Sequence, residues 1–576
     1  MEPAQPPTRS TFWSRRRVLG LICSAFAICL LLYPSSPSDS EWVIVSLPDA
    51  EIYQCDPNEP VKSVAIIGAG SGGASAAYYI DRFKHPCSRV NITVYERSSY
   101  VGGRSTTVDV YGDPTEPVEL GASIFVEVNK NLVSAAREFG LATQGLKSKI
   151  KELPNTLGVY DGQDWVFMGS ESGWWTMAKI LWKYGLAPIR TQQLMKKTVG
   201  AFLKMYDEPH FPFRDLSQTA YDLGLTEATA ATGEQFLQAK GIQGAFGTDI
   251  IQASTRVNYA QNIDKIHGLE SMVCMATDGA VSIQGGNWQI FDGMLKASEA
   301  KVLLNTSVFD IYRQSNGTYA VNALSSSYPT GIDLAIHDTV ILAAPLQFAK
   351  LSLTPAPMNP PPEIPYVNLH VTLFTSRRKL NPQAFNLESD VPTTILTTTP
   401  KTKANPPPFY SISTLRTLTN PISHQREYLY KIFSPAPVSA SWLHSILTPP
   451  LASPTLNIND RKDISWIYEK VWQSYPYLPP RITFEDVQLD EEGKVWYTSG
   501  IESFISTMET SSLMGMNVAR LVNDGWKRER MERMLVKLER EDKEKPVEEG
   551  RESAEGGDGG AMGQVPMAGK LSGEEL

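Results

Sequence analysis

The chain has 576 residues, of which 42% are apolar and 20% are charged, as is usual for a globular protein. This composition excludes a collagen, a coiled coil, a wholly disordered chain and a polytopic membrane protein. The net charge of −9 argues against a nucleic-acid-binding protein, which usually presents a basic face. Five cysteines are too few for a scaffold built from disulfides.

The first forty residues have the layout of a targeting segment. Arg15, Arg16 and Arg17 precede the uncharged apolar run 18–33. This run is 16 residues long. Its length therefore lies between that of a signal-peptide core, about 7–15 residues, and that of a membrane-spanning helix, about 20 residues. We therefore expect residues 1–40 to be a signal peptide or a signal anchor, which sends the protein into the secretory pathway or also holds it at a membrane.

Cysteines and glycosylation sequons fit a lumenal protein. Cys55, Cys87 and Cys274 follow the targeting segment, and an oxidising lumen permits one disulfide among them. The sequence does not choose the pair. Asn305 and Asn316 begin sequons, and Asn316, which precedes a glycine, is the better candidate for a glycan.

A dinucleotide-binding fingerprint follows the targeting segment. Residues 61–67 form a short apolar run, rich in β-branched residues, that is typical of a buried parallel strand, and a helix is expected at 74–83. Between them, Gly68 permits a tight turn, Gly70 lets the backbone approach a pyrophosphate, and Gly73 lets the helix pack on the strand. The helix N-terminus offers N–H groups to the phosphates.

The second expected strand, 91–95, ends at Glu96, 28 positions after Gly68. Its carboxylate would accept hydrogen bonds from the hydroxyls of an adenosine ribose. A glycine pair and an arginine follow at Gly102-Gly103-Arg104. This arrangement resembles the GG-motif flavoproteins, a family that includes the amine oxidases. The resemblance implies that FAD is the cofactor and that the arginine lies near its pyrophosphate.

Further segments resemble the same flavoproteins in the expected order. They are 119–123, the strand expected at 302–311, the strand 338–346, and the Gly-x-Glu stretch that precedes a helix expected from residue 503. The resemblance implies cofactor contacts, beyond the glycines of the first loop and Glu96, at Arg97, Gly103, Arg104, Gly121, Ala122, Val308, Gly500 and Glu502.

Residues 255–261, 279–282 and 285–288, with 500–502, resemble prenylcysteine oxidase, also called prenylcysteine lyase. The resemblance implies an α/β fold, in which a Rossmann-like FAD-binding domain is interleaved with a substrate-binding α+β domain. It implies oxidation of the thioether of farnesyl- or geranylgeranyl-cysteine by oxygen, giving cysteine, a prenyl aldehyde and hydrogen peroxide. The implied compartment is the lumen of the lysosome or vacuole.

The substrate would have a long apolar chain and a zwitterionic head. The stretch 174–205 could line a slot for the chain or belong to an ordinary core. Arg256 could pair with the carboxylate or serve the structure, and Asn258, Tyr259 and Gln261 could orient the head group or a water molecule. The seven histidines are scattered without metal-ligand spacing, so no metal site is expected.

The resemblance also divides the chain into domains. Prolines interrupt residues 354–408, where loops around short strands are expected, and the densely charged stretch 527–545 could form an exposed helix before a tail with almost no large apolar residue. The expected parts are 1–40, targeting segment; 60–145, 281–350 and 491–526, FAD-binding domain; 146–280 and 351–490, substrate domain; and 527–576, charged disordered tail.

Two alternatives share the expected scaffold. The first is a flavin amine oxidase, in which a C-terminal cysteine often tethers the flavin; no cysteine follows Cys274, which excludes that linkage. The second is a protein similar to Rab escort and GDP-dissociation-inhibitor proteins, which bind prenylated partners without catalysis. Such a protein would not need a complete flavin fingerprint.

Overall fold

The computed structural model describes residues 55, 57–145, 153–154, 156–170, 180–326, 331–399, 406–447 and 463–544. The chain divides into two compact units, Met1–Glu59 and Pro60–Leu576, and the elements below belong to the second. The expected targeting segment at 1–40 lies outside the described residues. In the part of the chain that is described, no helix combines the length and the apolar character needed to cross a membrane.

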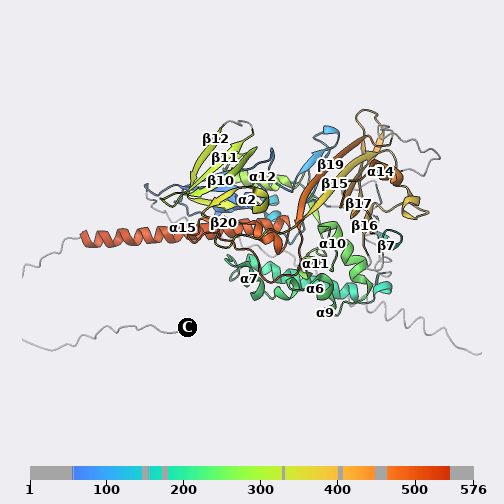
Figure 1. Cartoon of the computed structure of the whole chain (residues 1–576), viewed down its shortest axis with the longest axis horizontal. Helices are drawn as coiled ribbons and strands as arrows, with labels where there is room; N and C mark the ends of the chain where they lie inside the picture. Colours follow the sequence, from blue (N-terminus) through green and yellow to red (C-terminus); the bar gives the residue numbers. More distant parts are fainter. Residues whose placement is uncertain are drawn as a thin grey trace, which may run out of the picture. The chain divides into compact units, whose positions relative to one another are not determined.

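A five-stranded parallel sheet forms the first half of the fold (Figure 1). Its strands come from three separate stretches of the chain, as the interleaved organisation requires. The central strand 62–67 and its neighbour 339–342 have no exposed residue, because helices pack on one face of the sheet and residues of a second sheet pack on the other. In spatial order the strands are β20 (Val495–Tyr497), β13 (Thr339–Leu342), β1 (Lys62–Ile67), β2 (Val90–Tyr95) and β9 (Lys301–Leu303).

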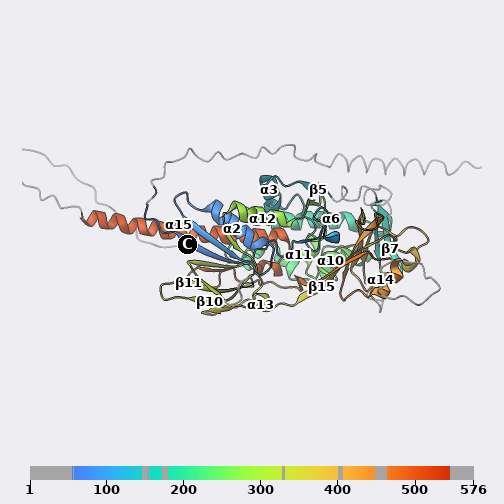
Figure 2. The same ribbon diagram turned by 90° about the horizontal axis from the view of Figure 1, so that it is seen from above.

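Helices α2 (Ser71–Phe83) and α15 (Met508–Glu544) pack against each other, and α12 (Trp288–Ala297) also packs on α2 (Figure 2). The approach of α15 to α2 requires glycine, because a Cβ on Gly515 would lie 2.3 Å from the Gly72 carbonyl oxygen. Helix α15 continues to Glu544, so the tail predicted to start at residue 527 is helical over its first eighteen residues.

A seven-stranded sheet carries the substrate half of the fold, with apolar clusters on both faces. Its second strand, β15, spans eleven residues, so the expectation of only short strands in the Pro-rich region was wrong. The prolines at 355–365 end just before this strand, whose own sequence contains none. The spatial order is β19 (Trp466–Pro476), β15 (Tyr366–Ser376), β18 (Arg426–Ser434), β17 (Ser411–Thr419), β16 (Thr394–Thr397), β6 (Thr156–Tyr160) and β7 (Trp165–Ser170).

A layer of helices lies below the sheets in Figure 1 and completes the substrate half. Its buried residues join the largest apolar cluster, which they share with α2 and α15. The layer contains α6 (Ala187–Phe202), α7 (Leu216–Asp222), α8 (Thr226–Thr229), α9 (Gly233–Ala239), α10 (Gln252–Tyr259) and α11 (Gly268–Val273). Other short helices, which do not belong to this layer, are α3 (Lys130–Glu138), α13 (Leu346–Ala349) and α14 (Ala440–Leu447).

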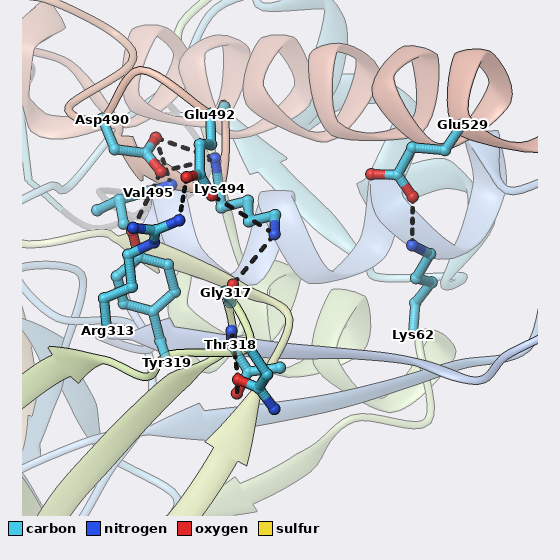
Figure 3. Close-up of polar contacts among 12 residues, drawn as sticks. Lys62, Arg313, Gly317, Thr318, Tyr319, Asp490, Glu492, Lys494, Val495 and Glu529 are labelled. Carbon is cyan, nitrogen blue, oxygen red and sulfur yellow. Dashed lines mark hydrogen bonds and ion pairs between the residues drawn. The ribbon is translucent and has the colours of Figure 1, made fainter. Parts of the chain in front are cut away.

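A four-stranded sheet flanks the parallel sheet and is tied to the segment before β20 (Figure 3). Asp490 accepts hydrogen bonds from the N–H groups of Lys494 and Val495, each at 2.9 Å, and Arg313 pairs with Glu492. The strand predicted at 302–311 is interrupted, because Asn305 takes a left-handed conformation between β9 and β10. The sheet contains β12 (Ile332–His337), β11 (Tyr319–Ser325), β10 (Thr306–Arg313) and β14 (Ser352–Thr354).

Two small pairs of strands and the cysteines complete the described fold. One pair joins β3 (Thr107–Asp109) and β4 (Pro117–Glu119), and the other joins β5 (Thr143–Gly145) and β8 (Val281–Ile283). Cys55 and Cys87 are disulfide-bonded, and Cys274 is a buried free thiol.

Candidate cofactor and active site

The first glycine loop connects β1 to α2, and its glycines have different tasks. Gly68 has a φ of +114°, which favours glycine. A Cβ on Gly73 would lie 1.9 Å from the Gly68 carbonyl oxygen, so glycine is needed there for the first turn of α2 to pack on the loop. A Cβ on Gly70 would find Gly103 Cα as its nearest neighbour, at 3.9 Å. Gly68 and Gly70 line a large cavity, whereas Gly73 lies behind it.

Glu96 stands at the end of β2 and lines the same cavity. Its carboxylate accepts hydrogen bonds from the N–H groups of Ala69, at 2.9 Å, and Ser98, at 2.7 Å. These bonds fix the carboxylate beside the glycine loop, where a ribose hydroxyl would donate to it. The neighbouring Arg97 also lines the cavity, and its guanidinium donates to the Phe348 carbonyl at 2.9 Å.

Arg104 and Glu502 form an ion pair on the cavity wall, with 2.7 Å between the guanidinium nitrogen Nη2 and the carboxylate oxygen Oε1. Tyr366 donates to the other oxygen of Glu502 at 3.1 Å, and Nη1 of Arg104 donates to the Ser474 carbonyl at 2.8 Å. Burial opposes the positive charge, but the carboxylate outweighs it and raises the pKa of Arg104. The pair joins the GG segment to the C-terminal Gly-x-Glu segment.

Of the remaining predicted cofactor contacts, three line the cavity and one packs behind its wall. Gly121, Ala122 and Val308 line the cavity. A Cβ on Gly121 would lie 2.7 Å from the Trp472 ring, so glycine is needed there for the indole to cover this stretch. Gly500 does not line the cavity; its Cα packs against Glu485, where an added Cβ would lie 3.0 Å from that side chain.

The N-terminus of α15 also opens on the cavity, through residues 508–511. Thr507 caps this helix, because its hydroxyl accepts a hydrogen bond from the Thr510 N–H at 3.0 Å. Among these residues, Glu509 accepts hydrogen bonds from the N–H groups of Asn131 and Leu132 at the start of α3. The N–H groups at the start of a long helix attract anions such as phosphate.

The cavity measures about 1070 Å³ and reaches from the glycine loop to the seven-stranded sheet and α6. Its far wall is largely apolar, as a site for a hydrocarbon chain requires. Part of that wall falls within the slot predicted at 174–205, whose members 174–179 lie outside the described residues. The apolar side chains include Ile124, Val199, Phe202, Leu203, Val273, Leu415 and Phe433.

Lys431 lies on this wall and was not recognised in the sequence. Its ammonium donates to the Glu119 carbonyl at 2.8 Å and to the Ser123 hydroxyl at 3.0 Å, and it lies 4.8 Å from the Phe433 ring centroid. A lysine among the apolar and aromatic residues 428–433 was the available signal, because lysine is almost never buried without a specific reason.

The structure separates the four predicted substrate residues. Asn258 and Tyr259 line the cavity, whereas Arg256 and Gln261 do not. Arg256 is 7% exposed, and its guanidinium donates to Thr397, at 3.1 Å, and Asn262, at 2.9 Å. Burial lowers the pKa of Arg256 to about 10, partly offset by Tyr410.

Gln261 and Asn258, two of the predicted substrate residues, form hydrogen bonds mainly with the backbone. Gln261 donates to the Pro476 carbonyl at 3.1 Å and accepts from the Leu478 N–H at 3.0 Å, which ties the end of α10 to the segment after β19. Asn258 donates to the Ser254 carbonyl at 3.0 Å. Within the described residues, no group of three or more His, Cys, Asp or Glu side chains could hold a metal ion.

These residues fit FAD. The Gly70–Gly103 contact leaves backbone without side chains along one wall, where any Cβ would reduce the space for a pyrophosphate. Glu96 suits the ribose, and two helix N-termini and Arg104 supply positive potential for the phosphates. The fold and cavity therefore define an FAD-dependent oxidoreductase with a Rossmann-like domain.

Solved structures and a domain profile support this fold. Residues 66–139 match the NAD(P)-binding Rossmann-like domain. A double mutant of putrescine oxidase has the same fold, with a TM-score of 0.51 and 15% identity over 80% of this chain and 99% of that chain. Cyclohexylamine oxidase from Brevibacterium oxydans IH-35A gives a TM-score of 0.50 and 15% identity over 81% of this chain and 100% of that one.

Sequence relatives give the family. Residues 167–533, more than half of the chain, match prenylcysteine lyase, so the chain belongs to the prenylcysteine lyase family. Farnesylcysteine lyase of Arabidopsis thaliana is 28% identical over 80% of this chain and 88% of its own length. Prenylcysteine oxidase 1 of Rattus norvegicus is 27% identical over 82% of this chain and 91% of its own length.

Proposed function

We propose that this protein is an FAD-dependent thioether oxidase that cleaves S-prenyl-L-cysteine, either farnesyl or geranylgeranyl. The observation that carries this proposal is one continuous cavity, which joins an FAD site to an apolar wall in a member of the prenylcysteine lyase family. The prenyl chain would lie against Val199, Phe202 and Phe433, with its head toward Lys431. The positive charge of Lys431 suits the carboxylate of the cysteine.

The net reaction consumes prenylcysteine, water and oxygen and yields cysteine, a prenyl aldehyde and hydrogen peroxide. Bound FAD supplies a two-electron acceptor that oxygen restores. The chain's own residues hold the thioether carbon against the cofactor, exclude bulk solvent with the apolar wall, and bind the charged head. The water oxygen joins the oxidised carbon, the carbon–sulfur bond breaks, and the sulfur keeps a proton.

Aerobic incubation with farnesyl-cysteine tests this function. We expect peroxide, farnesal and cysteine in equal amounts, with oxygen from labelled water in the aldehyde. A primary amine serves as the comparison substrate. Peroxide from the amine with none from the thioether would instead assign the protein to the amine oxidases. Tight binding without turnover would make it a prenyl-binding protein.

We also propose that the protein works in the lumen of the secretory pathway, in the lysosome or vacuole, with the N-terminal segment as its targeting signal or anchor. Supporting observations are the basic and apolar run in 1–40 and the disulfide bonds of Cys55 and Cys87, because disulfides persist in oxidising compartments. Asn316 is exposed in the β10–β11 turn, and Asn305 is half-buried.

Glycosidase treatment of the protein from its native cells tests the location. We expect a shift in mobility that the Asn316→Gln substitution reduces. The matched Asn305→Gln variant shows whether the second sequon is used. A protein that lacks any glycan and fractionates with the cytosol would contradict the proposed compartment.

A further inference from the structure

Three large apolar side chains project into solvent around the start of α6. The exposed fractions are 93% for Trp182, 60% for Leu186 and 41% for Ile189. Single exposed apolar residues are ordinary, but a cluster within eight residues that is rimmed by polar side chains marks an interaction surface. We call these residues, with the exposed basic residues of α6, the α6 face.

The opposite side of α6 is fixed in the core, so the orientation of the helix is well determined. Ala187, Thr191, Met195, Thr198 and Phe202 are buried at intervals of three or four residues. Ile189, Lys196 and Lys197 occupy the other side, because they are separated by two helical turns, and all three are exposed. Ile189 and the two lysines therefore share one face of α6, and the exposed Leu186 and Trp182 lie just before this helix begins.

The charge of this face is unusual for the chain. Residues 180–206 contain five Lys or Arg residues and no Asp or Glu, in a protein whose net charge is −9. Of the five, Lys183 pairs with Asp249 at 3.0 Å and Arg190 donates to the Gly241 carbonyl at 3.0 Å. The exposed Lys196 and Lys197 extend this positive surface along the helix.

We propose that the α6 face docks on an anionic phospholipid bilayer. Tryptophan and aliphatic residues that insert at the level of the headgroups, next to lysines that contact anionic lipid, are the pattern of an interfacial membrane-binding helix. A protein partner would not require this combination, because lysine is depleted in protein–protein interfaces. This inference goes beyond the proposed function and stands on the α6 face alone.

The α6 face lies on and just before the same helix that borders the apolar cavity. Near its end, α6 turns Val199 and Phe202 into the cavity, and Leu203 lines the cavity directly after the helix. A helix that rests on a bilayer at one end and borders an apolar cavity at the other would bring a membrane-dissolved prenyl chain close to the site. Docking therefore raises the local concentration of an insoluble substrate.

Quenching of tryptophan fluorescence by brominated lipid tests the docking in the full chain with bound FAD. Vesicles of brominated phosphatidylcholine are used with and without phosphatidylserine. We expect quenching in the anionic vesicles that falls in the Trp182→Phe variant. Because the comparison isolates Trp182, it remains valid if the N-terminal segment itself binds the vesicles. Identical quenching with and without Trp182 would overturn the proposal.

Charge and apolar variants with matched controls sharpen the test. We expect Lys196→Gln/Lys197→Gln to reduce the Trp182-dependent quenching several-fold, whereas Lys537→Gln/Arg540→Gln, on the exposed part of α15, should not. Leu186→Ser should reduce it, and Ile422→Ser, at another exposed position, should not. Flavin absorbance verifies that each variant is folded. Equal effects of test and control variants would overturn the proposal.

A second copy of the chain is the competing occupant of the α6 face. Sedimentation of the protein without lipid addresses it. A monomer–dimer equilibrium that the Trp182→Phe and Leu186→Ser variants abolish would overturn the membrane proposal. Sedimentation that these substitutions leave unchanged, together with Trp182-dependent quenching, supports it. Neither readout depends on turnover, so a failure of the proposed enzymatic function would not be mistaken for a failure of docking.

Discussion

Charged side chains at the cavity are held by specific partners, and these partners determine which of them can serve a ligand. Arg104 forms an ion pair with Glu502. Arg256 donates two hydrogen bonds, to Thr397 and Asn262, and does not line the cavity. Lys431 donates to the Glu119 carbonyl and the Ser123 hydroxyl but, unlike Arg256, lines the cavity, where a substrate carboxylate would gain a charge-assisted hydrogen bond. The residue chosen from sequence as the carboxylate partner is therefore less well placed than one that was overlooked.

Kinetics with two substrates test whether Lys431 or Arg256 binds the substrate carboxylate. We expect Lys431→Met to raise the KM for farnesyl-cysteine by about ten- to a hundredfold, the worth of a hydrogen bond to a charged group. The KM for the decarboxylated analogue should change little. Arg256→Met should lower the free energy of unfolding and affect both substrates equally. A selective loss of farnesyl-cysteine binding in the Arg256 variant would return the carboxylate to Arg256.

Glu270 in α11 introduces a pH dependence of stability. It is fully buried, and it accepts a hydrogen bond from the Ser506 N–H at 3.2 Å, in the loop that leads to α15. Burial raises its pKa to about 7, although the Tyr259 hydroxyl and the Ser506 N–H favour the charged form. The folded state thus binds the proton more tightly than the unfolded state, so stability falls as the pH rises from the ordinary glutamate pKa to about 7.

Denaturation of Glu270→Gln and the parent protein measures this effect. We expect the free energy of unfolding of the parent, relative to the variant, to fall by about 2 kcal/mol between about pH 5 and about pH 8. The control is Glu227→Gln, an exposed glutamate paired with Lys240. A difference between Glu270→Gln and the parent that does not change with pH would show that Glu270 keeps its charge throughout.

At the scale of elements, glycines permit three close approaches: the glycine loop to α2, α2 to α15, and the loop of Gly70 to that of Gly103. The first two serve the packing of helices, and the third shapes the cavity. The backbone of Gly70 has a φ of −79° and a ψ of −170°, which any residue can adopt. A side chain at Gly70 would therefore occupy the space of the ligand without straining the fold.

Two glycine variants should fail in different ways. We expect Gly70→Val to fold with nearly unchanged thermal stability of the apoprotein but to bind no FAD. We expect Gly73→Ala to fold poorly, because its Cβ would collide with the Gly68 carbonyl oxygen. Circular dichroism and flavin absorbance provide the measurements, with Gly200→Ala in an open part of α6 as the control. A Gly70→Val variant that retains yellow colour would contradict the role of that glycine.

At the scale of the whole molecule, the cavity is enclosed by segments that are remote in sequence. The glycine loop, the GG segment, Val308, the N-terminus of α15 and strands of the seven-stranded sheet all reach it. A ligand that contacts all of them stabilises the folded state, because it binds the folded chain and not the unfolded one. FAD should therefore contribute to stability as well as to chemistry.

Removal of FAD should lower the melting temperature, and its return should restore it. At an FAD concentration about a hundredfold above the dissociation constant, the added stability is about 2.7 kcal/mol. Scanning calorimetry of the stripped and reconstituted protein measures the difference, and NAD⁺ at the same concentration is the control. Equal melting temperatures with and without FAD would mean that FAD does not bind the folded chain.

The sequence alone determined the local features of this protein. The apolar run at 61–67, the glycines of the first loop and Glu96 are close neighbours in the chain, so backbone geometry and hydrogen bonding specify them without distant contacts. The same applies to the GG segment, whose pattern identified the cofactor class.

Only the tertiary structure decided which distant residues meet. It paired Arg104 with Glu502, turned Arg256 away from the cavity and placed Lys431 on its wall, because contacts between residues far apart in the chain depend on how loops, helices and strands pack together. It also made one long strand at 366–376, since this proline-free stretch pairs with a strand on each side. The exposed face of α6 likewise depends on which side of the helix the core buries.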